Sequence, residues 1–146
     1  MVERRCAVAA AARVVGDRWA LLIMREAFYG RTRFDEFEKG LGVATSVLSA
    51  RLKSLVEYGL LERRANTAGK RQTYHLSEKG KAFFPVYVAL QSWADQWSPE
   101  VEGAVTRLYD AKTGKEIRAA PLVRADGSEI LCEDMVIWDQ RPQCDA

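Results

Sequence analysis

Residues 44–58 carry the pattern that most restricts how this chain can fold. Apolar side chains recur there at helical spacing and form one stripe: Leu48, Leu52, Leu55 and Val56. The opposite face carries short, polar or basic side chains: Ser46, Ser49, Ala50 and Lys53. A helix divided in this way buries one face and leaves the other free to contact base edges in a major groove. Gly59 ends the helix, and Thr45 or Ser46 is expected to cap its start.

A basic β-hairpin is predicted directly after this helix. Residues 60–65 and 72–76 are its expected strands, and the tip between them contains Lys70 and Arg71. A short turn over 39–42 joins the polar-faced helix to the helix before it, as a helix-turn-helix requires. A polar-faced helix followed by a basic hairpin is typical of a winged helix-turn-helix, so we expect an α+β fold that binds DNA.

The remaining helices are predicted over 7–15, over 18–29, from Thr32 or Arg33 onward, and over 78–96. Asp17 is placed to cap the second of them, and Pro85 either kinks the long helix or is tolerated in its first turn. The first helix and the long helix are too apolar for so small a domain. This predicts that both pack against the partner subunit of a homodimer. The alternative is that they only complete the core of the monomer.

A domain boundary is expected between a DNA-binding and dimerisation domain over 1–98 and a small β-rich extension over 99–146. Turns at 110–115 and 125–128 separate three or four predicted strands of this extension. Cys132 falls in one of these strands, where a core position is expected. The extension could serve as an effector pocket, as a dimer clamp or as an inert cover.

The charge distribution agrees with this division. The net charge of +2 combines 16 Lys and Arg against 10 Asp and Glu in residues 1–99 with 6 against 10 in residues 100–146. Basic surface therefore gathers where phosphates would be bound, and the acidic extension is expected to stay off DNA. No apolar run approaches a membrane span and no signal peptide is recognisable, so a cytoplasmic location without a membrane partner is expected. Three widely spaced cysteines indicate neither a disulfide framework nor a metal site, and no cofactor is expected.

Several segments, taken in order, resemble the HxlR-type transcriptional regulators: residues 6–8, 16–26, 30–37, 47–55, 59–64 and 74–80. The likeness covers about residues 6–97. It implies a homodimeric winged-helix protein, related to MarR-type regulators, that binds pseudo-palindromic sites near the genes it controls. We expect a repressor.

Two departures from the family pattern stand out. Ala7 replaces the proline that usually follows the cysteine. The extension resembles a zinc-ribbon-like unit of longer relatives, which carries cysteine pairs at its two turns. Those turns have no cysteine here, so no zinc is expected.

Eight residues are the expected DNA contacts: Arg33, Thr45, Ser46, Ser49, Arg51, Lys53, Lys70 and Arg71. Ser46, Ser49 and Lys53 are placed to contact bases, whereas Thr45 and Arg51 are placed on phosphates. Lys70 and Arg71 are expected in the minor groove or on flanking phosphates, and Arg33 is expected to add a backbone contact. The alternative is that the helix face is only a solvated surface.

Cys6 is the candidate redox sensor, because the matching cysteine of some relatives responds to electrophiles or oxidants. Arg4, Arg5 and the start of the first helix would favour its thiolate. The alternative is a cysteine packed near the dimer interface without a redox role. A pocket between the long helix and the first helix could hold a small apolar effector.

Two other classes of function compete with a regulator. A winged-helix module that binds proteins instead of DNA would carry an acidic or apolar recognition face, which this sequence lacks. An enzyme would need a catalytic constellation, and neither a catalytic Ser/His/Asp order nor a metal-ligand cluster nor a phosphate-binding glycine loop stands out. No catalytic residues are therefore expected.

Overall fold

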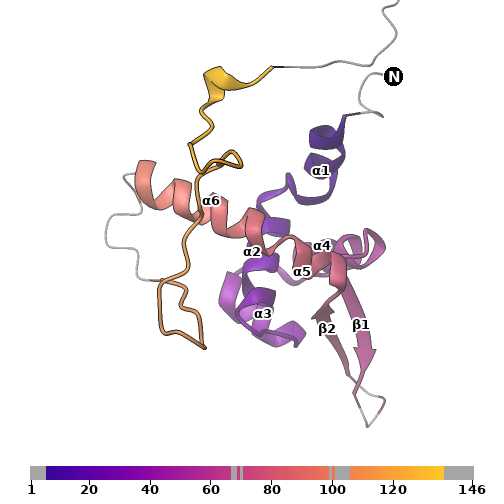
Figure 1. Cartoon of the computed structure of the whole chain (residues 1–146). Coiled ribbons are helices and arrows are strands. Elements are labelled where there is room, and N and C mark those ends of the chain that lie inside the picture. Colours follow the sequence, from indigo (N-terminus) through magenta and orange to yellow (C-terminus); the bar gives the residue numbers. More distant parts are fainter. Residues whose placement is uncertain (1–5, 67–68, 70, 99, 101–105, 137–146) are drawn as a thin grey trace, which may run out of the picture.

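The computed structural model describes residues 6–66, 69, 71–98, 100 and 106–136 (Figure 1). The helices are α1 (Ala7–Val15), α2 (Arg18–Phe28), α3 (Phe34–Leu41), α4 (Thr45–Glu57), α5 (Glu78–Ala82) and α6 (Phe84–Trp97). The strands β1 (Leu61–Ala65) and β2 (Gln72–Leu76) form one antiparallel hairpin between α4 and α5. None of the helices in the described ranges is long and apolar enough to cross a membrane.

The hydrophobic core lies between α2, α3, α4 and the base of the hairpin. Its largest fully buried side chains are Ile23, Met24, Phe37, Leu48, Leu52, Leu55 and Leu61. The predicted apolar stripe of α4 supplies three of them, which fixes the helix with its polar face outward. The predicted helix-turn-helix with its wing is therefore confirmed.

The ends of the helices show which capping predictions hold. Asp17 caps α2 as expected, since its Oδ1 accepts hydrogen bonds from the backbone of Trp19 and Ala20. The predicted cap of α4 is wrong, because the N-cap is Ala44, which makes no side-chain cap. Thr45 is the first residue of the helix, and its hydroxyl does not cap the helix but donates to Glu38 Oε1 at 2.6 Å.

The hairpin is joined to the segment between α2 and α3. Within the hairpin, Leu61 pairs with Leu76 and Ala65 pairs with Gln72. The backbone N–H of Tyr74 donates to Thr32 O at 2.7 Å, and an isolated bridge links Arg33 to Thr73. The start of α3 is therefore held against the wing.

The long helix that the sequence predicts is divided at Phe83. Phe83 closes α5 and opens α6, and Pro85 lies in the first turn of α6, one of the two placements expected for it. Ser77 caps α5 by accepting from Gly80 N, and its hydroxyl also donates to Leu60 O at 3.1 Å. Gly80 is in close contact with the hairpin, because a Cβ there would lie 2.1 Å from Leu60 O.

The extension is less regular than the sequence predicts. Among the described residues 106–136 it forms two loops, each closed by a single bridge: Tyr109 with Glu116, and Val123 with Glu129. The core position predicted for Cys132 is wrong, since this residue is exposed in a short 3₁₀ helix, Cys132–Asp134. Extended pairing fails because the intervening chain has no buried face to fix a register.

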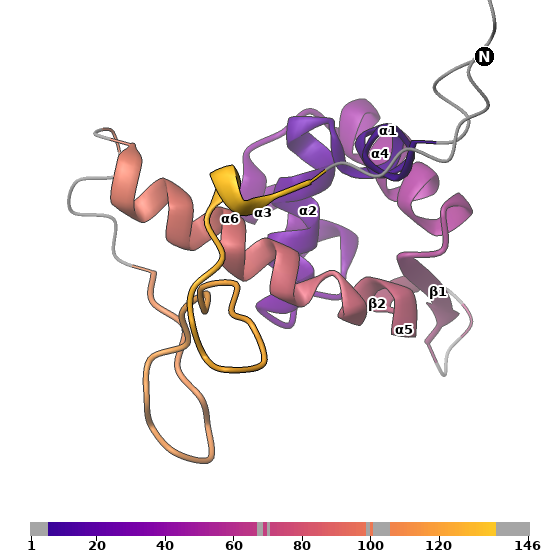
Figure 2. The same ribbon diagram turned by 45° about the horizontal axis from the view of Figure 1, so that its top comes forward.

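Figures 1 and 2 both show the extension running beside α6. Two hydrogen bonds hold it there: Gln91 Nε2 donates to Thr106 O at 2.8 Å, and Ala119 N donates to Ser92 Oγ at 3.1 Å. The core residues all precede residue 98, and the described residues 106–136 lie against the surface of α6.

Candidate nucleic-acid interface

The exposed face of α4 presents the side chains that the sequence predicts for base contact. Ser46, Ser49 and Lys53 are exposed, and Thr45 lies beside them at the start of the helix. Lys53 Nζ lies 4.0 Å from Glu57 Oε1, a distance at which an exposed ion pair is weak. The face is therefore short-chained and open, with hydroxyl groups and one cation available for hydrogen bonds.

Arg51 lies on the flank of α4 and already has a partner within the chain. Its Nε donates to Asp17 Oδ1 at 3.0 Å, so α4, the candidate recognition helix, is joined to the start of α2. Burial pushes the pKa of Asp17 upward, but hydrogen bonds from Ala20 N and Arg51 outweigh it and hold that pKa below its usual value. The Asp17 carboxylate is therefore charged at neutral pH.

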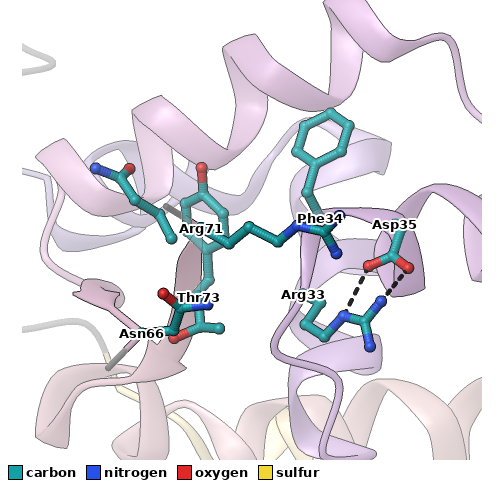
Figure 3. A pocket seen from close by; sticks show the side chains of 8 residues that line it. Arg33, Phe34, Asp35, Asn66, Arg71 and Thr73 are labelled. Atoms are coloured by element: carbon teal, nitrogen blue, oxygen red, sulfur yellow. Dashed lines mark hydrogen bonds and ion pairs between the residues drawn. The ribbon is translucent and has the colours of Figure 1, made fainter. Parts of the chain in front are cut away.

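Arg33, at the N-cap of α3, makes two hydrogen bonds to its acidic partner, whereas Arg51 makes one. Its Nε donates to Asp35 Oδ1 at 3.0 Å and its Nη2 donates to Asp35 Oδ2, so both carboxylate oxygens are engaged (Figure 3). The hydrogen bonds from Arg33 lower the pKa of Asp35. This pairing offsets the charge that Arg33 would offer to a phosphate.

The wing faces Arg33 across an open cleft of about 600 Å³. Figure 3 shows Arg71 and Thr73 on the hairpin side of this cleft, with Arg33 and Asp35 on the other side. Arg71 is exposed and makes no ion pair with any described residue. Lys70, the other predicted contact at the tip, lies outside the described residues.

Sequence reasoning did not predict the two acidic partners of these arginines. Asp17 was identified only as a cap, and its second role depends on α4 lying across the start of α2. Asp35 lies only two residues after Arg33, and this short spacing is a local signal for a pair. Both acids reduce the charge of the interface at specific points.

Cys6 is exposed at the N-cap of α1. Figure 1 draws α1 above the body and the strands β1 and β2 below it. None of the residues of α1, all of which the structure describes, is buried, and Val8 is 77% exposed. On α6, Trp93 and Trp97 are 63% and 66% exposed. The predicted dimerisation helices thus leave large apolar groups uncovered in the single chain.

Comparisons with known proteins agree with this geometry. Residues 14–102 match the family model described as HxlR-like helix-turn-helix. The chain is 36% identical over 129 residues to Rv3095, an uncharacterised HTH-type transcriptional regulator of Mycobacterium tuberculosis. That alignment covers 88% of this chain and 82% of the relative.

Two solved structures extend the likeness to the fold. The candidate transcription factor PA1607 has a TM-score of 0.85 and 37% identity, covering 92% of this chain and 94% of that chain. The reduced form of the transcriptional regulator YodB from Bacillus subtilis has a TM-score of 0.57 and 31% identity, covering 65% and 96%. A diamide-treated form of YodB has a TM-score of 0.53 and 32% identity, covering 63% and 94%.

Proposed function

The chain belongs to the HxlR-like family of helix-turn-helix transcriptional regulators, and on that premise we propose that it represses genes by binding a pseudo-palindromic operator as a homodimer. The observation that carries the proposal is that α4 has one buried apolar face and one exposed polar face. Leu48, Leu52 and Leu55 anchor the helix in the core, while Ser46 and Ser49 lie on its exposed face. In a dimer the two copies of α4 enter successive major grooves.

The wings extend this contact to the flanking DNA. Arg71 on each hairpin is exposed, and Lys70 adds a second cation to the tip. These side chains bind phosphates or the minor groove and position the protein without selecting a sequence. Arg33 contributes less than Arg71, because Asp35 holds its guanidinium.

Homodimerisation is supported by the uncovered apolar groups of α1 and α6. Val8, Trp93 and Trp97 would be costly to leave in water, and the two helices offer more apolar area than the body can cover. Pairing α1 and α6 with their copies in a second chain removes this area from water.

Cys6 is proposed as a thiol sensor for oxidants or electrophiles. It is exposed, and it lies at the start of a helix assigned to the dimer interface, so its modification would disturb the spacing of the two recognition helices. The relative YodB, which has been crystallised in reduced and diamide-treated forms, supports a redox response in this family.

The test is a titration of the purified protein against DNA from upstream of its own gene. A scrambled duplex serves as the control, at several salt concentrations, with and without diamide. A preference of roughly a thousandfold for the native sequence is expected. Loss of binding under diamide in the wild type, but not in Cys6→Ser, is expected if Cys6 is the sensor.

Two substitutions separate specificity from affinity. Arg71→Ala should weaken binding to all sequences alike and lower the salt slope by roughly one unit per lost contact. Ser49→Ala should change the sequence preference across a library of sites. If both variants bind like the wild type, the assigned interface is wrong. If the wild type binds no duplex even at low salt, a protein-interaction module becomes the better description.

A further inference from the structure

Asp17 serves two elements through a single oxygen atom. Its Oδ1 accepts from Trp19 N at 2.9 Å and from Ala20 N at 3.2 Å, which caps α2. The same Oδ1 accepts from Arg51 Nε at 3.0 Å, across a sequence separation of 34 residues. The start of α2 is therefore fixed to a side chain of the recognition helix.

The pair leaves the outer part of Arg51 free. It uses only Nε, and neither Nη1 nor Nη2 donates a hydrogen bond to any described residue. Because the guanidinium group is planar and rigid, a bond at Nε fixes the direction in which both Nη groups point. Arg33 differs, since Asp35 engages its Nε and its Nη2 together.

Arg51 also lies on the part of α4 where a phosphate contact is expected. Its side chain is 41% exposed, between the exposed Ala50 and the fully buried Leu52. The centre of the exposed face, with Ser46 and Ser49, approaches the bases, and side chains on the flank of such a helix lie beside the sugar-phosphate backbone.

We propose that Asp17 is a positioning residue for DNA binding, which holds Arg51 so that its two Nη groups meet a backbone phosphate. This inference rests on the proposed function. Asp17 is itself negative and lies near the DNA, so by charge alone its removal would strengthen binding. A loss of affinity when the Arg51 contact is removed therefore reports orientation and not charge.

Two substitutions at Asp17 isolate this role. Asp17→Asn and Asp17→Ser are both neutral and both good N-caps, so they match in charge and in helix stability. Asparagine keeps an oxygen where Oδ1 accepts from Arg51, whereas the shorter serine does not reach it. The affinity of each full-length variant is measured on a fluorescent duplex from upstream of its own gene.

The serine variant should bind about tenfold more weakly than the asparagine variant, as expected for one charged hydrogen bond. Their melting temperatures should agree within a few degrees, because a partly exposed contact of this kind contributes little to stability. In an Arg51→Ala background the two variants should bind equally. Arg51→Ala alone should lower the salt slope by about two units for a dimer, one for each subunit. Arg51→Lys keeps the charge but not the planar guanidinium group. In this background too, the asparagine and serine variants should bind DNA with equal affinity.

Equal binding by the asparagine and serine variants would overturn the inference, as would a difference that persists without Arg51. An unchanged salt slope in Arg51→Ala, together with a lowered melting temperature, would make the pair a structural tie only and would also overturn it. These outcomes leave the proposed function intact. If instead the wild type shows no salt-dependent binding to this duplex or to a scrambled one, the proposed function fails and the inference fails with it.

Discussion

The body of the molecule and its C-terminal extension are stabilised in different ways. In the body, side chains from separate helices meet in a core where Phe37, Leu48 and Leu52 are completely buried. Among residues 106–136 of the extension no described side chain is buried, and Leu122 and Val136 are largely exposed. The body is therefore organised by apolar burial, whereas the extension is organised by its turns.

Local hydrogen bonds and ion pairs hold the loops of the extension. Asp110 accepts from Lys112 N and from the hydroxyl of Thr113, and Glu116 pairs with Arg107 and Arg118. Exposed ion pairs contribute little to stability. The comparison teaches that the extension is held by its turns and by two hydrogen bonds to α6, whereas the body is held by its buried side chains.

The largest expected effect comes from a cavity in the core. Leu52→Ala should lower the free energy of unfolding by about 3–4 kcal/mol, because the surrounding helices cannot fill the space. Leu122→Ala in the extension removes the same atoms from an exposed position and should change it by less than about 0.5 kcal/mol. Chemical denaturation measures both, and similar losses for the two variants would contradict the contrast.

A glycine pair sharpens the same comparison. Gly80→Ala places a methyl group against the backbone oxygen of Leu60 and should cost about 2–3 kcal/mol, since neither α5 nor the hairpin can move freely. Gly114, with φ of +68° and open space around it, is the control in the extension. Gly114→Ala should strain only its own turn and leave the thermal unfolding of the body unchanged. A lower melting temperature for Gly114→Ala would show that the two regions unfold together.

Ser77 tests the junction of the wing with α5. Ser77→Ala removes the cap on Gly80 N and the bond to Leu60 O, and should destabilise the body by about 1–2 kcal/mol. Ser77→Thr keeps both hydroxyl functions and serves as the control. Hydrogen exchange should increase first at Gly80 and Lys81, and unchanged exchange at these amides would show that the cap is not needed.

Removal of the extension should have the smallest effect on folding. A chain that ends after Ser98 loses the hydrogen bond that Gln91 donates to Thr106 O and the one that Ser92 accepts from Ala119 N, and it keeps every core residue. Its melting temperature at a fixed protein concentration should stay within a few degrees of the full chain, because about 0.5 kcal/mol shifts it by no more than that. A collapse of the melting temperature would show that the extension stabilises the body or its dimer.

The body could be predicted because its signals are local and repeated. The apolar period of α4, the cap at Asp17 and the glycine after α4 each determine the structure of a few neighbouring residues. The extension could not, since its apolar residues have no core to select one register. Turn residues alone predicted the positions of its loops but overestimated the length of its strands.

The candidate site shows the same difference between features set by local sequence and features set by long-range packing. The exposed face of α4 follows from helical spacing, so the exposure of Ser46, Ser49 and Lys53 could be predicted from the sequence. The pairing of Arg51 with Asp17 could not, because it joins residues far apart in the chain and depends on how two helices cross. Side chains that sequence analysis assigns to phosphates can thus already have partners within the protein.

The most direct test of the account is a hydroxyl-radical footprint of the full-length protein on DNA from upstream of its own gene. Two copies of α4 in successive major grooves predict two protected half-sites whose centres are about 10–10.5 base pairs apart, or a multiple of that spacing. Protection by the wings should flank each half-site. A single protected segment without two-fold symmetry would contradict the homodimer, and uniform weak protection along the duplex would contradict sequence-specific regulation by this surface.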